Sequence, residues 1–349
     1  MAKSPTLVDA PLRQKRPTLK TVAAASGLAV TTVSRALNDG DDIALKTRER
    51  VKRIAAELGY VPDRAGRGLR TGRSHVLALV LAPHARVSGY TASIIAGLSD
   101  VCRAQGYELA ITPEEADTDP LSTVRSIVEN RRADGVIVSR IQPQDIRVRY
   151  LLESGFPFVT HGRTELASAH AYVDFDNQAF TESGARRLAE RGRTRLALIG
   201  APADLTYGAH MTMGFLRGVA QAGVDAVELP QALSIETPLP VMRAVLAEVF
   251  AGEARPDGVV CGGDLPTLAV LAAIRDSGLT PGVDVEVFAK QTSDVLDHTH
   301  PAIDTCVENI QHTGRELAEL LLKAVAGVEV PAELATLIAP EYRLRTEKP

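Results

Sequence analysis

Residues 30–38 read Val30-Thr31-Thr32-Val33-Ser34-Arg35-Ala36-Leu37-Asn38. Val33, Ala36 and Leu37 recur at i, i+3 and i+4, which places them on one face of a helix. A shorter helix over residues 19–26 should come first, with Thr18 as its N-cap. Two short helices joined by a tight Gly-containing turn predict an all-α helix-turn-helix head, whose second helix fits the major groove of DNA.

A further helix over residues 45–58 should close the core of this head. Its inward side chains are expected to be Val51, Ile54, Ala55 and Leu58. Its other face carries basic residues that we expect to be mostly solvated, namely Lys46, Arg48, Arg50, Lys52 and Arg53. We therefore predict a DNA-binding domain over residues 18–62, preceded by a flexible leader over residues 1–17.

The charge distribution supports a nucleic-acid partner for this head. Residues 1–75 hold 15 Lys and Arg against 7 Asp and Glu, which leaves 24 against 36 in the rest of the chain. The head is therefore cationic, although the whole chain has a formal net charge of −4. Lys and Arg that neutralise DNA phosphates release condensed counterions, so this pattern favours DNA binding over a basic disordered tail.

Composition argues against several other classes of protein. A length of 349 residues fits two or three domains, and 45% hydrophobic residues are enough for ordinary buried cores. Cys102, Cys261 and Cys306 are far apart in sequence, which argues against a zinc site or a disulfide framework and fits a reducing cytoplasm. Residues 1–17 lack the apolar region of a secretory signal, and no stretch is long enough to span a membrane. We expect a cytoplasmic, nucleoid-associated protein with neither a metal nor a cofactor.

Many positions of the head recur at fixed spacings: Thr18-Leu19-Lys20-Thr21-Val22-Ala23, Gly27, Thr32-Val33-Ser34-Arg35-Ala36-Leu37-Asn38, Lys46-Thr47-Arg48-Glu49-Arg50-Val51, and Leu58-Gly59-Tyr60-Val61-Pro62. This pattern resembles the headpiece of the lac-repressor (LacI/GalR) family of bacterial transcription regulators, and the resemblance covers nearly all of the chain after the leader. It implies base contacts by Val30, Thr31 and Arg35, of which Arg35 would reach a guanine edge. It also implies phosphate contacts by Thr18, Thr32, Ser34, Asn38, Thr47 and Tyr60.

The chain departs from this family at the starts of two helices. The family usually has Ser before the recognition helix and before the third helix, where this chain has Ala29 and Ala44. Loss of a Ser cap typically costs about 0.5–2 kcal/mol. We therefore expect the headpiece to be only marginally stable by itself, with Asp41 or Asp42 as a possible substitute cap at the third helix.

Residues 63–75 should form a hinge between the head and the body. In the family this segment folds on DNA and wedges a Leu into the minor groove, and Leu69 matches that position. Arg67 is a further candidate DNA contact in the same segment. Gly66 and Gly68 each cost about 1 kcal/mol in a helix interior, so we expect this hinge to be disordered off DNA. The alternative is a plain Gly/Arg linker with no wedge.

From residue 76 onward, strands and helices alternate. We predict strands over residues 76–81, 107–111, 135–139, 158–160, 195–199, 258–261, 283–288, 303–307 and 341–344. Helices are predicted over residues 91–105, 121–130, 144–154, 178–190, 209–222, 240–250, 266–277 and 313–325. Such alternation predicts an α/β body of doubly wound parallel sheets. Two such halves resemble the periplasmic-binding-protein architecture of the family, so residues 76–349 should form an effector-binding and dimerisation core. Each lobe should be discontinuous in sequence, with the ligand between the lobes, beyond the carboxyl ends of the strands.

The same resemblance implies effector-site positions, namely Tyr90, Arg163, Asp176, Met211, Asp264, Lys290, Gln291 and Glu308. Arg163 and Asp176 suit sugar hydroxyls, and the alternative for each is a salt bridge within its loop. The family commonly has Arg where this chain has Met211. It commonly has Asp after the strand over residues 283–288, where this chain reads Ala289-Lys290-Gln291. These exchanges rearrange the charge of the pocket, so we expect neither the lactose-like nor the purine-like mode of binding.

The sequence as a whole predicts a homodimeric transcription regulator that binds a pseudopalindromic operator under the control of a small molecule. Repression is expected rather than activation. A sugar is the first expectation for the effector, and a sugar phosphate or sugar acid paired with Lys290 is the alternative. A sugar-binding protein or an enzyme on the same body fold is the alternative from another class. A dinucleotide-binding enzyme would need G-x-G-x-x-G after the first strand, where this chain reads Pro83-His84-Ala85.

Overall fold

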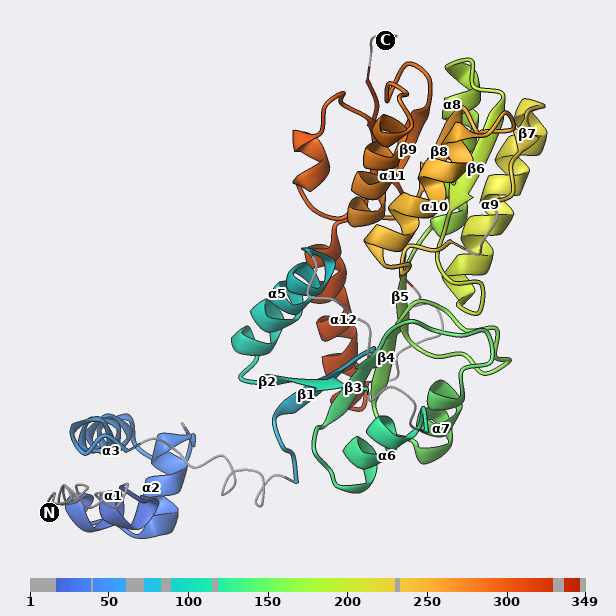
Figure 1. Cartoon of the computed structure of the whole chain (residues 1–349). Helices are drawn as coiled ribbons and strands as arrows, with labels where there is room; N and C mark the ends of the chain where they lie inside the picture. The colour runs from blue at the N-terminus through green and yellow to red at the C-terminus, as the bar shows by residue number, and fades with distance from the viewer. Residues whose placement is uncertain are drawn as a thin grey trace, which may run out of the picture. The chain divides into compact units, whose positions relative to one another are not determined.

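The computed structural model describes residues 17–38, 40–60, 72–82, 89–114, 119–229, 233–328 and 336–345. The chain divides into two compact units, Met1–Ser74 and His75–Pro349, which are described separately below (Figure 1). Arg67 and Leu69 of the predicted hinge, and the loop of residues 83–88, lie outside the described residues. Within the described ranges, no helix is long and apolar enough to cross a membrane.

The first unit has the predicted helix-turn-helix, built from α1 (Leu19–Ser26), α2 (Val30–Leu37) and α3 (Leu45–Glu57). Thr18 caps α1, because its side chain accepts a hydrogen bond from the backbone N–H of Thr21. Gly27 ends α1 in the left-handed region, with a φ of 68°. The helices pack around a shared core whose buried members are Val22, Ala23, Val33, Ala36, Val51 and Ala55. The apolar face predicted for the second helix is therefore the buried face.

Leu58 was expected in this core, and that expectation is wrong. The helix α3 ends at Glu57, and Leu58 is its exposed C-cap. Gly59 then takes a φ of 64° and reverses the chain. As a result, Tyr60 donates its backbone N–H to the carbonyl of Ala55 at 2.8 Å and packs against the core. The helix ends before Leu58, so Leu58 does not continue its apolar face, and Tyr60 after the turn contacts the core instead.

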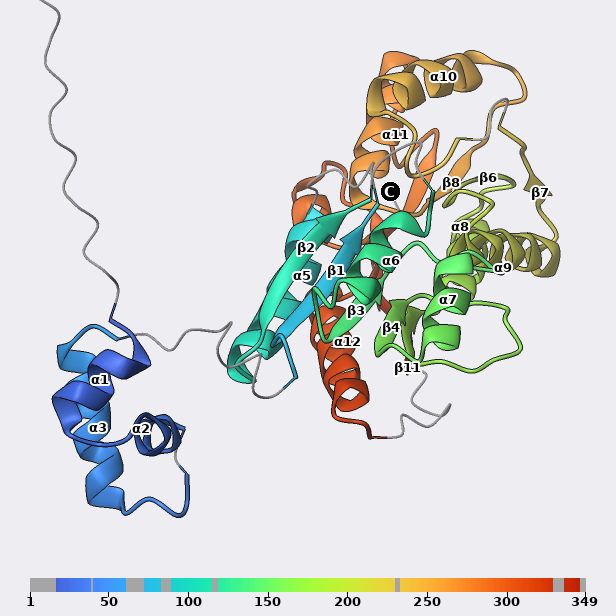
Figure 2. The same ribbon diagram turned by 90° about the horizontal axis from the view of Figure 1, so that it is seen from below.

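One lobe of the second unit is a parallel sheet with the strand order β11-β5-β4-β3-β1-β2. Its strands are β1 (Val76–Leu81), β2 (Glu108–Pro113), β3 (Gly135–Val138), β4 (Phe158–His161), β5 (Tyr172–Phe175) and β11 (Thr336–Ile338). Its helices are α5 (Gly89–Ala104), α6 (Ser122–Glu129), α7 (Ile146–Ser154) and α12 (Ile310–Val325). The helices α5 and α12 cover one face of this sheet, and α6 and α7 cover the other (Figures 1 and 2).

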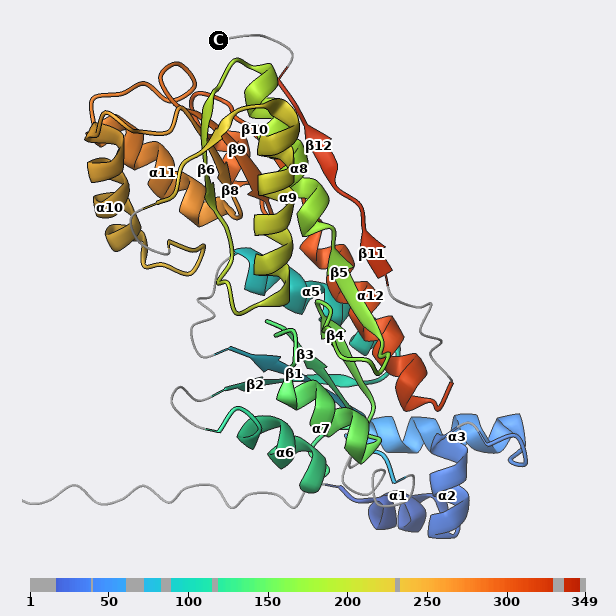
Figure 3. The same ribbon diagram turned by 90° about the vertical axis from the view of Figure 1, so that its right-hand side faces the viewer.

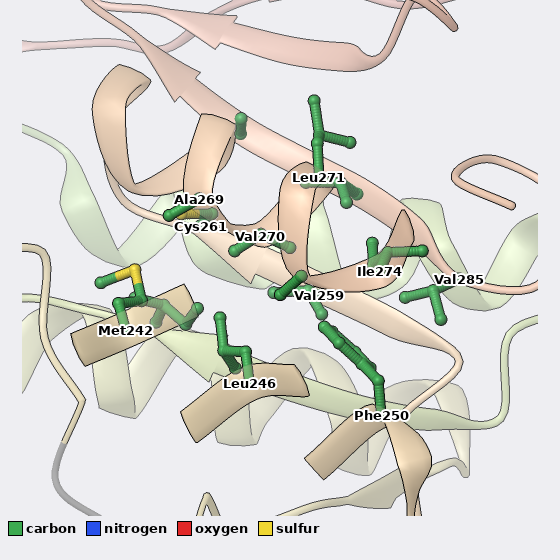
Figure 4. Packing of buried hydrophobic residues seen from close by; sticks show 14 of the residues in the cluster. Met242, Leu246, Phe250, Val259, Cys261, Ala269, Val270, Leu271, Ile274 and Val285 are labelled. Atoms are coloured by element: carbon green, nitrogen blue, oxygen red, sulfur yellow. The ribbon is translucent and has the colours of Figure 1, made fainter. Parts of the chain in front are cut away.

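The other lobe is a sheet with the strand order β12-β10-β9-β8-β6-β7, parallel except for the edge strand β12. Its strands are β6 (Arg195–Ile199), β7 (Asp225–Ala226), β8 (Gly258–Cys261), β9 (Glu286–Gln291), β10 (Asp304–Val307) and β12 (Glu341–Arg343). Its helices are α8 (Asn177–Glu190), α9 (Thr206–Ala222), α10 (Leu239–Ala251), α11 (Asp264–Asp276) and the short 3-10 helix η1 (Val295–His298). On one face, Leu246 and Phe250 of α10 and Ile274 of α11 meet Val259 of β8 (Figure 4). The helices α8 and α9 pack against each other and cover the opposite face (Figure 3).

Each lobe is discontinuous in sequence, as predicted. The chain passes from β5 to α8, from β10 to α12, and from β11 to β12, each time changing lobe (Figure 3). Three short strands, β5, β7 and β11, were missed because each has at most four residues and depends on its neighbours for pairing. The strand β9 begins three residues later than predicted and ends at Gln291. Lys290 and Gln291 therefore lie inside a buried strand and not in a loop after it.

Candidate functional site

The recognition helix α2 turns one side to the core and the other to solvent. Val33 and Ala36 are fully buried, whereas Val30, Thr31 and Arg35 are exposed. Asn38 is also exposed, and Thr32, Ser34, Thr47 and Tyr60 are partly buried. The side chains to which the family resemblance assigns base contacts thus lie on the exposed face of the helix.

Several of the predicted DNA contacts have partners within the headpiece. Arg35 forms an ion pair with Asp42, and both side chains are about half exposed. Asn38 donates from its amide nitrogen to the carbonyl of Ser34 at 2.6 Å. The hydroxyl of Thr18 interacts with that of Thr21 in the capping box of α1. For Arg35, binding to DNA would mean exchanging a carboxylate partner for a base edge.

Among the described residues, no side chain caps α2 at Ala29 or α3 at Ala44. The substitute cap considered for the third helix is therefore not seen, and Asp42 is paired with Arg35 instead. Arg50, expected to be solvated, donates to the carbonyl of Ser26 at the end of α1 at 2.9 Å. This contact ties α3 to α1 and helps to satisfy a helix end.

In the second unit, polar side chains gather at the carboxyl ends of strands from both lobes, and His161 lies among them. The hydroxyl of Tyr90 and Nδ1 of His161 are 2.6 Å apart. Burial raises the pKa of Tyr90 well above its ordinary value, with Glu308 adding to the effect, so the hydroxyl keeps its proton. The other ring nitrogen, Nε2, lies 3.8 Å from Oε1 of Glu308.

Glu308 is also bound to Lys290, and this pair is buried. Nζ of Lys290 lies 2.9 Å from Oε2 of Glu308 and 2.5 Å from Oδ1 of Asn177. The ammonium also lies 4.4 Å from the centre of the Phe175 ring. Burial alone would raise the pKa of Glu308, but the charge of Lys290 and the nearby His161 outweigh it and lower the pKa to about 2. The charge of Lys290 is therefore neutralised inside the protein.

Arg163 connects the two lobes. Its Nε donates to Oδ2 of Asp174 at 2.8 Å, and its NH2 lies 3.4 Å from Nδ1 of His210 on α9. Burial raises the pKa of Asp174, with Arg163 opposing the shift, whereas burial and Arg163 both lower the pKa of His210. This arrangement offers a guanidinium, a carboxylate and a neutral imidazole, which are groups that hydrogen-bond well to hydroxyls.

Four other predicted effector residues are bound within the protein. Asp176 caps α8 by accepting from the N–H of Ala179 at 2.9 Å. Met211 of α9 is fully buried in the core to which α8 and α9 both contribute. Asp264, at the start of α11, accepts from the hydroxyls of Thr292 and Ser293 at 2.7 and 2.9 Å. Gln291 is buried in a network with other side chains of its lobe, namely Asp297 and Thr305. These residues shape the site rather than present free groups to it.

The sequence reasoning missed His161, Asp174, Asn177 and His210 as members of this cluster. A signal existed for the first three, because they lie at or next to the ends of strands β4 and β5, where parallel sheets bind ligands. His210 lies inside α9, and nothing in its local sequence marks it. Its position follows only from how α9 faces the other lobe.

Comparisons with known proteins agree with both units. Residues 18–63 match the family described as bacterial regulatory proteins, lacI family, and residues 185–346 match a periplasmic binding protein-like domain. The chain is 31% identical to the HTH-type transcriptional regulator CelR of Thermobifida fusca over 332 residues, which cover 90% of this chain and 94% of that protein. The structure of a CelR–cellobiose complex matches 95% of this chain and 99% of its own, with 28% identity and a TM-score of 0.70.

The fold is shared more widely. The lac repressor dimer bound to operator and the anti-inducer ONPF superposes with a TM-score of 0.80 at 19% identity, covering 95% of this chain and 98% of that one. The relatives named here are regulators of transcription. The headpiece, the two-lobed body and these similarities lead to one conclusion. This chain belongs to the lacI family of bacterial regulatory proteins and is a DNA-binding transcription regulator controlled by a small-molecule ligand.

Proposed function

We propose that this regulator binds a neutral sugar at the carboxyl ends of the strands where its two lobes meet. The observation that carries the proposal is the pairing of the charges there. Lys290 is neutralised by Glu308, and Arg163 is held by Asp174. An anionic effector that binds Lys290 or Arg163 would have to break one of these pairs. The break would leave a buried carboxylate without its partner, which is strongly unfavourable. A neutral polyol needs only hydrogen bonds, which Arg163, Asp174 and His210 can exchange with its hydroxyls.

The relatives suggest which sugar to try first. The CelR structure is a complex with cellobiose, and CelR of Thermobifida fusca is similar to this chain over most of its length. Cellobiose is therefore the first candidate effector. We propose that its site is lined by Tyr90, Arg163 and Glu308. The other predicted residues would hold the surrounding structure in place, namely Asp176, Met211, Asp264, Lys290 and Gln291.

On DNA, we propose that the exposed face of α2 enters the major groove. Arg35 would leave Asp42 for a guanine edge, and Val30 and Thr31 would set the operator preference by contacts to neighbouring bases. One headpiece covers one half-site, so we propose a homodimer on a pseudopalindromic operator, acting as a repressor. Domain boundaries at residues 18–62, 63–75 and 76–349 are part of the same proposal.

The effector proposal is tested by thermal unfolding and calorimetric titration of the full chain with cellobiose, other neutral disaccharides, a glucose phosphate and gluconate. A ligand at 100 times its Kd should stabilise the protein by about 2.7 kcal/mol. We expect a response to a neutral disaccharide and its loss in Arg163→Met. Arg217→Met is the matched control, since Arg217 is an exposed arginine on α9 that pairs within its own lobe, with Glu182. A response to the anionic compounds alone would refute the neutral-sugar proposal.

A further inference from the structure

We propose that residues 139–145, the loop between β3 and α7, are a latch that fixes the two lobes against each other, and that Arg147 positions this latch. The inference deepens the proposed function, because an effector that closes the lobes would act through such a contact. It goes beyond the effector site, since these residues hold one lobe to the other.

The latch contacts the second lobe at consecutive residues. The ion pair between Arg140 and Glu236 joins the lobes at side chains that are about one-third exposed. The next two residues also contact the other lobe. The carbonyl of Ile141 accepts from the N–H of Thr206 at 2.9 Å, and Nε2 of Gln142 donates to Oδ2 of Asp204 at 3.2 Å. Residues that are consecutive in one lobe thus bind the start of α9 and the segment before α10 in the other.

The carbonyl of Ile141 accepts a hydrogen bond from the N-terminal end of a helix in the other lobe. The first backbone N–H groups of a helix have no partner within the helix. Among the described residues, no side chain caps α9 at its N-cap, Leu205. Thr206, the first residue of α9, is buried and donates its N–H to Ile141 O. Separation of the lobes would remove this acceptor from a buried donor, so the contact favours the observed arrangement of the lobes.

The latch is held in shape by a buried arginine. Arg147 donates through Nε and NH2 to the carboxylate of Asp145, at 3.0 and 2.7 Å, and through NH1 to Glu114 at 2.8 Å. Its NH2 also donates to the carbonyls of Ser139 and Arg140, at 3.2 and 3.0 Å. The side chain of Arg147 is 9% exposed, and that of Asp145 is 2% exposed. The loop is therefore anchored at both ends by one guanidinium.

Arg140 shows why such an anchor is needed. Its φ is 55°, in the left-handed region that residues with a Cβ atom rarely adopt. Strained residues of this kind persist where the surroundings determine the backbone fully, and they cluster at functional sites. Here the bond from Arg147 to the carbonyl of Arg140 fixes that backbone, and the side chain reaches Glu236 in the other lobe.

The latch adjoins the proposed effector site. The strand β3 pairs with β4, which ends at His161, and a Cβ added at Gly162 would lie 3.5 Å from Ile141. A ligand that moves Arg163 or His161 would therefore displace Ile141, whose carbonyl accepts from the first N–H group of α9. In the other lobe, Tyr207 follows Thr206 directly. Burial raises the pKa of Tyr207 to about 12, with Arg140 opposing the shift and Glu308 adding to it. The latch and the proposed site thus share neighbours in both lobes.

Electron–electron double resonance on the ligand-free full chain tests the latch. Spin labels at Glu153→Cys on α7 and Glu248→Cys on α10 report the distance between the lobes, and both positions are exposed. The native cysteines Cys102, Cys261 and Cys306 are buried, which disfavours their labelling. We expect one narrow distance distribution in the parent protein. Arg140→Ala and Glu236→Gln should each shift it to longer distances and broaden it.

The controls separate a latch from a general loss of structure. Exchanging the pair, with Arg140→Glu and Glu236→Arg together, should restore the narrow distribution. Arg315→Ala removes an exposed ion pair with Asp100 inside one lobe and should leave the distribution unchanged. An unchanged distribution in both single variants, or a failure of the exchanged pair to restore it, would overturn the latch. Because no ligand is present, failure of cellobiose to bind would refute the effector proposal without touching this result.

Discussion

Lys290 and Glu308 form a buried ion pair that results from the register of two parallel strands. Lys290 in β9 lies opposite Cys306 in β10. Glu308 follows Cys306 by two residues, so its side chain lies on the same face as Lys290, and Nζ and Oε2 are 2.9 Å apart. Both residues are at most 6% exposed. The charge on each is therefore compensated by the other and not by water.

Removal of one partner should be far more harmful than removal of both. Lys290→Met should lower the free energy of unfolding by about 3–5 kcal/mol, because Glu308 is left as a buried charge without a partner. Lys290→Met combined with Glu308→Gln should recover much of that loss. Urea unfolding of the ligand-free protein measures both, with Arg315→Met as a control for an exposed pair worth about 0–1 kcal/mol. Equal losses in the single and double variants would show that the pair is not coupled.

The same pair predicts how stability depends on pH. The pKa of Glu308 falls from 4.5 to about 2 on folding, so the native state favours the ionised carboxylate. This stabilisation is present above the unfolded pKa and is lost as the pH falls from about 4.5 towards 2. The shift corresponds to about 3 kcal/mol at neutral pH. In acid unfolding experiments, the stability of the parent protein relative to the Lys290→Met, Glu308→Gln double variant should fall as the pH drops through this window, and a constant difference would contradict the assignment.

A Ser at either uncapped helix start should stabilise the headpiece. Ala29→Ser and Ala44→Ser can each supply an acceptor for the first-turn N–H groups and should add about 0.5–2 kcal/mol. Hydrogen exchange of the α2 and α3 amides in the full chain measures the gain. Ala25→Ser is the matched control, since Ala25 is exposed within α1 and occupies no cap position. Equal protection in all three variants would mean that the missing caps do not limit stability.

Asp42 should weaken DNA binding by competing for Arg35. Asp42→Asn removes a negative charge and the ion pair, so it should raise affinity for an operator selected from random duplexes. Arg35→Met should lower operator affinity by about 1–3 kcal/mol and affect scrambled DNA less, because a base contact carries the specificity. Fluorescence anisotropy at one fixed salt concentration compares both DNAs. A uniform loss on both DNAs in Arg35→Met would place Arg35 on phosphate and not on a base.

Leu69 remains a prediction from the sequence, since it lies outside the described residues. If it wedges between base pairs, Leu69→Ala should weaken operator binding much more than non-specific binding, because only the kinked complex uses the wedge. The measurement is the ratio of the two affinities in the same anisotropy assay. Arg67→Ala in the same segment is the comparison, and it should lower both affinities to a similar degree if Arg67 contacts phosphate. An unchanged ratio in Leu69→Ala would leave residues 63–75 as a plain linker.

The sequence by itself determined the features that depend on short-range physics. The strands β1, β6 and β8 were predicted with their observed bounds, because continuous apolar runs mark buried parallel strands. The helix α1 was also predicted to the residue, because its cap at Thr18 and its end at Gly27 are local. The headpiece pattern and the alternation of strands and helices then sufficed for the fold class and for DNA binding.

Tertiary structure alone decided where charged residues lie within strands. The strand β9 carries Glu286 and Lys290 at buried positions, although the local pattern placed Lys290 after the end of the strand. They are tolerated there because distant residues neutralise them: Arg191, Arg193 and Arg345 surround Glu286, and Glu308 pairs with Lys290. The latch from Arg140 to Glu236 likewise joins residues of different lobes. Such pairs depend on contacts between segments far apart in the chain, and local sequence periodicity carries no record of them.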